Sequence, residues 1–199
     1  MKKNIKLLIG THNKGKFREI SKLINRNIKK ISPKKLKIKA PNETGKTFKS
    51  NSELKAKFFF KKSNIVSLSD DSGLEIFALN KKPGIYSARW AKKYGSFKKA
   101  MLKILNRMNN NKNRKARFIC SLSIKLNKNK LITAIGIING NISYKILGTK
   151  GFGYDPIFIP NKYKITFGQM PITKKMKIDH RSMAFKRLKS KLKLLKFFI

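Results

Sequence analysis

Apolar residues occur along this chain in two patterns, short continuous runs and runs with helical spacing. Residues 5–10 form a short apolar run that ends at a glycine, and apolar residues then recur at helical spacing over 14–25. The helix predicted at 47–62 has Thr47 as its expected N-cap. The same pattern predicts further strands at 36–40, 65–68, 74–79, 117–126, 131–138 and 142–147, and further helices at 94–108 and 180–198.

The order of these elements predicts an α/β fold with a mixed β-sheet and flanking helices. Strands and helices alternate in the first half of the chain, and a hairpin through residues 127–130 joins 117–126 to 131–138. The sequence contains no internal repeat and no recognisable linker, and 199 residues suit one domain. We therefore expect residues 1–199 to form a single domain.

Positive charge dominates the composition, because 50 Lys and Arg residues stand against 8 Asp and Glu, a formal net charge of +42. Such an excess is typical of nucleic-acid-binding proteins, so a basic nucleic-acid-binding module is one alternative. However, 42 lysines outnumber 8 arginines and are spread along the whole chain. Specific readers of nucleic acid rely on the planar guanidinium of Arg. We therefore favour a compositional bias toward Lys, Asn and Ile, and expect no specific nucleic-acid partner.

Two features of the sequence bear on where the protein works. It contains no apolar run of about 18 residues, so no membrane span is expected, and the first apolar run is too short for a signal peptide. The single cysteine, Cys120, excludes an intramolecular disulfide framework and a Cys-rich zinc site. We expect a protein of the reducing cytoplasm.

A loop with glycines at Gly10 and Gly15 follows the first predicted strand and ends in Lys16. Backbone N–H groups at a helix N-terminus, together with a lysine and polar side chains, bind phosphate oxygens. The spacing fits the Gly-x4-Gly-Lys of a P-loop, but Phe17 stands where a P-loop has Ser or Thr for magnesium. A P-loop kinase or NTPase is therefore the enzymatic alternative, and an ordinary polar turn is the structural one.

A second polar segment, residues 69–73, carries Asp70 and Asp71 directly after the strand predicted at 65–68. Two adjacent carboxylates at a strand end suit Mg²⁺, because hard cations prefer oxygen ligands. A carboxylate beside such a metal can also orient or deprotonate a water for attack on phosphorus. A capped turn is the alternative, since Asp and Ser are common turn residues.

Two further segments indicate recognition of a flat ring. In residues 151–156, two glycines allow close approach of a ligand, Phe152 could stack on a base, and Asp155 could accept from base N–H groups. Near the start of the last predicted helix, Lys175 and the basic residues of 179–181 suit an anionic or carbonyl-bearing ligand. The four segments together predict a nucleoside triphosphate as the ligand.

These motifs, in this order, resemble the inosine triphosphate pyrophosphatase family, which includes dITP/XTP pyrophosphatases. The resemblance covers nearly the whole chain, and its most specific parts are the central motif and Gly-Phe-Gly-Tyr-Asp-Pro. The segments that carry it are 11–19, 43–56, 70–74 with 83–89, 151–158 and 180–181.

The resemblance implies an elongated α/β fold with two lobes around a central substrate cleft, in a homodimer. It implies Mg²⁺-dependent hydrolysis of ITP, dITP and XTP to the monophosphate and pyrophosphate, which keeps deaminated purines out of DNA and RNA. A pocket of hydrogen-bond donors would favour the C6 oxygen of these bases over the amine of adenine.

By motif position, the resemblance also assigns residues to the site. Glu43 and Asp71 would bind Mg²⁺, and Asp71 would also activate the water. The residues assigned to the triphosphate are Thr11, Asn13, Lys16 and Ser72, with His12, Lys14 and Gly15 in the same loop. Those assigned to the base are Phe152, Gly153, Tyr154, Asp155, Lys175, His180 and Arg181.

Two segments depart from the family pattern. Asp179 stands where the family has Ser before His-Arg, which places an acid next to the expected pocket. Gln169 and Lys174 lie in a stretch where family members often carry Glu. Neither departure removes a residue assigned to the metal or to the phosphates.

Overall fold

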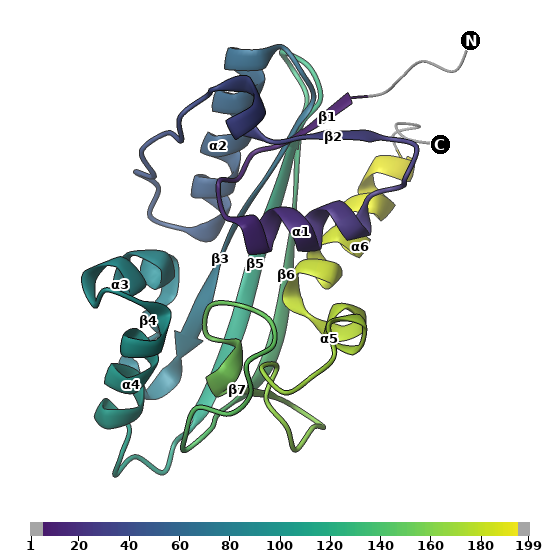
Figure 1. Cartoon of the computed structure of the whole chain (residues 1–199). Helices are drawn as coiled ribbons and strands as arrows, with labels where there is room; N and C mark the ends of the chain where they lie inside the picture. Colours follow the sequence, from purple (N-terminus) through teal and green to yellow (C-terminus); the bar gives the residue numbers. More distant parts are fainter. Residues whose placement is uncertain (1–5, 195–199) are drawn as a thin grey trace. The chain divides into compact units, whose positions relative to one another are not determined.

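The computed structural model describes residues 6–194, and the chain divides into two compact units (Figure 1). Unit 1 comprises residues 6–71, 120–136 and 181–194, and unit 2 comprises residues 72–119 and 137–180. Each unit has its own apolar core. Each is also assembled from segments that are far apart in the sequence.

The described strands form a seven-stranded mixed sheet. They span Lys6–Ile9 (β1), Lys29–Ile31 (β2), Ser67–Ile76 (β3), Lys82–Pro83 (β4), Lys115–Lys125 (β5), Leu131–Ile142 (β6) and Phe158–Pro160 (β7). Their hydrogen-bonded order is β2-β1-β3-β5-β6-β7, and β4 pairs with β3. β1 is parallel to β2 and β3, whereas β3–β4 and β6–β7 are antiparallel. The predicted α/β class and mixed sheet are therefore confirmed.

The core of unit 1 lies between strands and helices. Its helices span Lys14–Leu23 (α1), Phe48–Ser63 (α2) and His180–Leu194 (α6), of which His180 belongs to unit 2. Ile20 of α1 and Leu188 of α6 are buried with Leu68 of β3, and the two helices lie beside each other in Figure 1. Phe59 of α2 packs on Leu8 of β1. These contacts bury the apolar face of each helix against the sheet.

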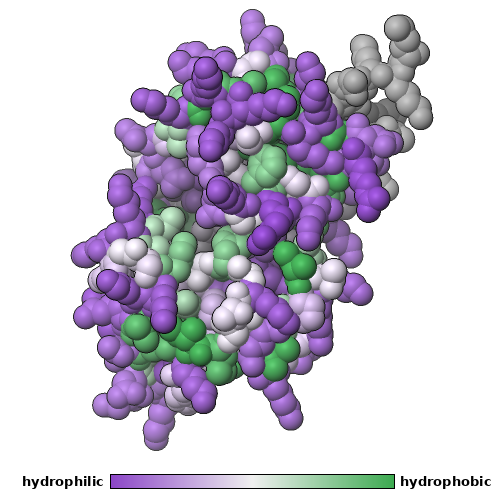
Figure 2. All heavy atoms as spheres, in the orientation of Figure 1, coloured by the Kyte–Doolittle hydropathy of each residue, from purple (hydrophilic) through white to green (hydrophobic). Residues whose placement is uncertain are grey.

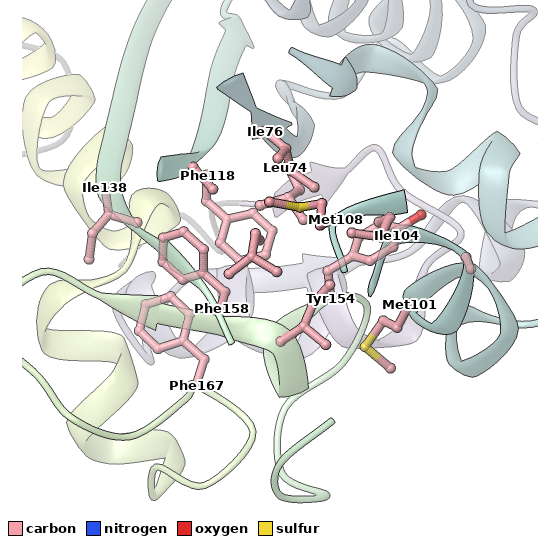
Figure 3. Packing of buried hydrophobic residues seen from close by; sticks show 14 of the residues in the cluster. Leu74, Ile76, Met101, Ile104, Met108, Phe118, Ile138, Tyr154, Phe158 and Phe167 are labelled. Carbon is pink, nitrogen blue, oxygen red and sulfur yellow. The ribbon is translucent and has the colours of Figure 1, made fainter. Parts of the chain in front are cut away.

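Unit 2 has an aromatic core. Its helices span Ser87–Lys93 (α3), Phe97–Arg107 (α4) and Ile172–Ile178 (α5). Phe118 of β5 packs against Phe158 of β7, with ring centroids 4.7 Å apart (Figure 3). The Phe167 ring stacks on the Phe118 ring. Met101 and Ile104 of α4 complete this core. Its residues come from both segments of unit 2, so the core holds those segments together.

The surface is hydrophilic over most of the face drawn in Figure 2, with small hydrophobic areas between the polar side chains. Lysines are exposed on many elements, for example Lys22 on α1 and Lys103 on α4. No helix within residues 6–194 combines the length and the apolar character needed to cross a membrane.

The predicted strand at 36–40 is wrong. The chain instead forms β2 earlier and then a short 3₁₀ turn over Pro33–Leu36. Pro33 fixes a helical φ at the start of this turn, Ser32 caps it, and Lys37 ends it in the left-handed region.

The helix predicted at 94–108 is confirmed as α4, which begins at Phe97 after Gly95, where φ is +84°. The helix before it, α3, was not predicted. β6 extends only to Ile142, so the strand predicted at 142–147 is not formed, and the pattern also missed α5 and β7. By contrast, Thr47 caps α2 as expected, and its side chain accepts a hydrogen bond from the Ser50 N–H. The predicted end of the last helix, residues 195–198, lies outside the described residues.

Candidate active site

The loop from Gly10 to Asn13 in unit 1 connects β1 to α1 and presents the first turn of this helix. Asn13 is the N-cap, because its Oδ1 accepts from the Lys16 N–H at 3.0 Å, and Thr11 Oγ1 accepts from the Asn13 N–H at 3.2 Å. A Cβ at Gly10 would lie 2.1 Å from Ser69 Oγ, so the close approach of the loop to β3 requires glycine. The exposed His12 donates from Nε2 to a backbone carbonyl at 3.0 Å, and Lys14 and Gly15 begin the helix.

The strands predicted at 65–68 and 74–79 are one strand, because β3 continues through residues 69–73 from Ser67 to Ile76, so the alternative of a capped turn is wrong. Consecutive side chains of a strand point to opposite faces. Asp70 and Asp71 accordingly contact different lysines, and both are buried, with 1% and 4% of their surface exposed. Turn-forming residue types suggested a loop here, but charged partners compensate for the missing apolar side chains.

Asp70 belongs to a buried ionic network within unit 1. Its Oδ2 lies 3.0 Å from Lys16 Nζ and 3.7 Å from Arg181 Nη2. Arg181, which is 1% exposed, also forms an ion pair with Glu19 of α1. Burial would raise the pKa of Asp70, but the charges of Lys16, Arg181 and Lys55 outweigh it and lower the pKa to about 2. Asp70 therefore stays ionised and holds the Lys16 ammonium in place.

Asp71 belongs to a second network, which reaches α2 and the loop before it. Asn51 Nδ2 donates to Asp71 Oδ2 at 3.3 Å, and Lys55 Nζ lies 3.6 Å from Asp71 Oδ1. The same ammonium donates to Glu43 Oε1 at 2.5 Å. Asn51 also accepts from the Gly45 N–H at 2.8 Å, which fixes the loop that carries Glu43. The resemblance assigned both carboxylates to a metal ion, and in the structure both contact the same ammonium group, that of Lys55.

The pKa values in this second network are shifted by burial and by neighbouring charge. Burial raises the pKa of Asp71, and the charges of Lys55 and Lys16 only partly oppose this. For Lys55, burial lowers the pKa, but Asp71, Asp70 and Glu43 raise it further, so the net shift is upward. Asp71 is thus a carboxylate with enhanced proton affinity next to a lysine that remains charged.

The donor set of Glu43 and Asp71 fits a hard divalent cation. Both carboxylates contact one positive charge, the Lys55 ammonium. Carboxylate oxygens are also the ligands that Mg²⁺ prefers. Within residues 6–194 no group of three or more His, Cys, Asp or Glu side chains is arranged to hold a metal. A metal here would therefore need further ligands from substrate and water, as is common for Mg²⁺.

The glycine-rich loop lies in unit 2 and is organised by Asp155. Asp155 Oδ2 accepts from the Phe152 N–H at 2.8 Å and from Lys175 Nζ at 2.6 Å. The Lys175 ammonium also lies 5.0 Å from the centroid of the Phe152 ring. Asp155 and Lys175 are 2% and 1% exposed, whereas Phe152 is only half-buried. Phe152 is therefore the side chain of this loop that is available to a ligand.

Tyr154 and His180, two further predicted base-binding residues of unit 2, are buried. The Tyr154 hydroxyl donates to the Ser87 carbonyl at 2.9 Å, and burial raises the pKa of this tyrosine. The His180 ring stacks on Phe118 at 4.8 Å between centroids, and Asp179 is 1% exposed. Gly153, also assigned to the base, is partly exposed and has a positive φ of 67°. Ser72, assigned to the triphosphate, follows Asp71 in β3 and is partly exposed.

Three residues of unit 1 had no role in the sequence prediction, namely Glu19, Asn51 and Lys55. Asn51 and Lys55 are four positions apart, so they share one face of the predicted helix 47–62. Both also lie in the segment 43–56 that carries the family resemblance, which was a signal that could have been used to give them a role. Glu19 lies in the segment 11–19 that carries the resemblance, but its partner Arg181 is 162 positions away, so their ion pair has no signal in local spacing.

Several curated proteins match this chain over nearly its whole length and nearly their own whole length. A dITP/XTP pyrophosphatase of Zymomonas mobilis is 38% identical over 92% of this chain and 90% of its own. The dITP/XTP pyrophosphatase of Caulobacter vibrioides is also 38% identical, over 94% of this chain and 97% of its own.

Two solved structures are similar over almost the whole chain. The Staphylococcus aureus Ham1 protein has a TM-score of 0.84 at 34% identity, covering 94% of this chain and 98% of its own. A HAM1 protein from Coxiella burnetii has a TM-score of 0.86 at 31% identity, covering 95% and 98%. The sequence model of the Ham1 family matches residues 7–191. With a family match over nearly its full length and relatives of this identity, the chain belongs to the Ham1 family.

Proposed function

We propose that this protein is a nucleoside triphosphate pyrophosphatase that hydrolyses ITP, dITP and XTP to the nucleoside monophosphate and pyrophosphate. The observation that carries the proposal is the convergence of Glu43 and Asp71 on one cation in the same unit as Lys16. Relatives named dITP/XTP pyrophosphatase and membership of the Ham1 family support it. The consequence of the activity is removal of deaminated purines from the nucleotide pool.

The start of α1 supplies the triphosphate contacts in this proposal. Thr11, Asn13 and the N–H groups of the first turn face the phosphates, where the helix dipole favours negative charge. Lys16, held by Asp70, contributes a fixed positive charge. His12, Lys14, Gly15 and Ser72 are assigned beside them.

Asp71 acts as the general base in the proposed reaction. It accepts a proton from water, and the water oxygen bonds to the α-phosphorus. The bond from that phosphorus to the α–β bridging oxygen breaks, and the electron pair leaves with pyrophosphate. Burial, which raises the pKa of Asp71, makes the carboxylate a better proton acceptor than an exposed aspartate.

Glu43 and Asp71 would hold Mg²⁺, with oxygen ligands of the substrate completing the set. When bound, the metal supplies positive charge that neutralises the phosphate oxygens. Lys55 would keep the two carboxylates in place when the metal is not bound, because its ammonium contacts both.

Recognition of the base is assigned to residues of unit 2 and to Arg181. Phe152 stacks on the purine, and Asp155 fixes the Phe152 backbone. Gly153, Tyr154, Lys175 and His180 are assigned to the same recognition. The buried contacts of Tyr154, Lys175 and Arg181 favour a role in which each positions its neighbours within its own unit.

The deciding experiment is pyrophosphate release from ITP, dITP, XTP, ATP and GTP, each with Mg²⁺ and with a chelator. We expect rapid release from the first three with Mg²⁺, slow release from ATP and GTP, and loss of activity on chelation. Equal rates on ATP and ITP would refute the substrate assignment. Orthophosphate as the product would refute the reaction type.

We also assign the protein to the cytoplasm as a homodimer. The single cysteine, which is buried, suits a reducing compartment. Light scattering on the purified protein would test the dimer, and a mass of one chain, 22.9 kDa, would refute it.

A further inference from the structure

Unit 2 contains an open groove of about 1000 Å³ that the proposed pyrophosphatase reaction does not use. Its lining includes the basic residues Lys112, Arg114, Lys115 and Lys145. None of the described residues that line it is acidic. Because Lys112, Lys115 and Lys145 are exposed, their charges face solvent and are available to an anionic ligand.

Tyr144 is the most unusual residue of this groove, because 78% of its surface is exposed. The guanidinium carbon of Arg114 lies 4.5 Å from the centroid of the Tyr144 ring. A cation over the face of an aromatic ring is attracted to it and holds the ring in position. The remainder of the ring is open to solvent, so it offers a flat apolar surface to a ligand.

Arg114 is itself held rigidly. Its three guanidinium nitrogens donate to the backbone carbonyls of Ile142, Met108 and Ser143 at 3.0, 2.8 and 2.6 Å. Only 8% of its surface is exposed. With all three nitrogens bonded to backbone, Arg114 serves as a fixed support for the tyrosine ring. The ring is therefore pre-ordered, which lowers the entropy lost when a ligand stacks on it.

We propose that this groove binds single-stranded nucleic acid without preference for sequence. Tyr144 stacks on an unpaired base, and Lys112, Lys115 and Lys145 contact the flanking phosphates. An exposed aromatic ring combined with a groove of positive charge is the arrangement by which proteins bind single strands. An acidic peptide would use the lysines but would leave the exposed ring without a function.

The proposal gives part of the +42 charge a function beyond compositional bias. It agrees with the expectation of no specific nucleic-acid partner, because stacking and phosphate contacts do not read base edges. The proposed nucleic-acid binding does not depend on the proposed enzyme activity. It involves other residues, and it is tested by measuring binding rather than turnover.

The test measures binding of a labelled 12-nucleotide oligoadenylate by fluorescence anisotropy at several salt concentrations. We expect Tyr144→Ala to raise the Kd about tenfold, because stacking of one base is lost, and Tyr144→Trp to keep the affinity. The matched control is Tyr86→Ala in the same unit. Tyr86 is also exposed, with the Arg89 guanidinium carbon 5.0 Å from its ring centroid, but it does not line the groove.

A second pair of variants tests the phosphate contacts. Lys115→Gln should lower the slope of log K against log salt by about 0.7, the value for one phosphate of a single strand. Lys103→Gln, an exposed lysine of α4 outside the groove, should leave the slope unchanged.

Four results would overturn the proposal. The first is a Kd of Tyr144→Ala within twofold of the unsubstituted protein, and the second is an equal loss for Tyr86→Ala. The third is displacement of the oligonucleotide by AMP at the same nucleotide concentration, which would indicate a mononucleotide site. The fourth is equal dependence of polyglutamate binding on Tyr144, which would indicate a general polyanion surface.

Discussion

Asp70 and Asp71 are neighbours in β3, yet Asp70 lies 3.0 Å from the ammonium of Lys16 and Asp71 lies 3.6 Å from that of Lys55. Because adjacent side chains of a strand point to opposite faces, the two neighbouring carboxylates have different contacts and different expected roles. On one side a fully ionised carboxylate positions a lysine of α1. On the other, a carboxylate whose pKa is raised by burial lies beside the candidate metal position.

Asp71→Asn should abolish turnover while nucleotide binding remains. The amide keeps the size of the side chain but cannot accept a proton, and loss of a general base costs about 10²–10⁴ in rate. Steady-state pyrophosphate release and calorimetric binding of ITP measure the two effects. Glu75→Gln in the same strand is the control and should retain turnover. Unchanged kcat in Asp71→Asn would remove Asp71 from the reaction.

Lys16→Ala should raise KM more than it lowers kcat, because the lysine is proposed to bind phosphate in both ground and transition states. The kinetics with ITP measure both parameters. The control is Lys22→Ala, an exposed lysine in the last turn of the same helix. A KM equal to that of the unsubstituted protein would mean that the start of α1 does not contact the triphosphate.

Arg181→Met should lower the free energy of unfolding by about 3–5 kcal/mol, because it leaves the carboxylates of Glu19 and Asp70 buried without their arginine partner. Urea unfolding monitored by circular dichroism measures the change. The comparison is Lys49→Ala, which removes an exposed ion pair with Glu53 at 4.0 Å and should cost about 0.5 kcal/mol or less. Equal stability losses in the two variants would contradict the buried network.

The stability of the protein should fall between about pH 4 and pH 2 partly through Asp70. Its pKa in the folded chain is about 2, below the ordinary 3.8. The resulting stabilisation, about 2 kcal/mol, is complete above the unfolded pKa and is lost as pH falls through the folded one. Urea unfolding at several pH values in a chelating buffer should give a smaller pH slope for Asp70→Asn. An identical slope would show that Asp70 is not the group concerned.

The local parts of the fold could be predicted from sequence because their causes are local. The cap at Thr47 and the helix that follows it depend on residues within one turn, and both were predicted. The strand through Asp70 and Asp71 was not, because its charged residues are stabilised by Lys16, Lys55 and Arg181 from other elements. Residue type alone suggests a turn at that position.

The candidate site shows the same division. The family resemblance assigned Glu43 and Asp71 to one metal ion, and in the structure both carboxylates contact the Lys55 ammonium. The role of that ammonium was not predicted, although Lys55 lies in the segment 43–56 that carries the family resemblance. The stacking of Tyr144 on Arg114 was not predicted either, since the two residues are far apart in the sequence and Tyr144 lies within the strand wrongly predicted at 142–147.

The ion pair between Glu19 and Arg181 has a consequence for biosynthesis, because Glu19 is synthesised long before Arg181. A ribosome-bound chain that has completed α1 and β3 still lacks the arginine that balances Glu19 and Asp70. Unit 1 therefore reaches its native charge balance only after residue 181 has left the exit tunnel. Until then, any premature closure of this core buries two acids without their arginine, which favours folding of unit 1 only after residue 181 has been synthesised.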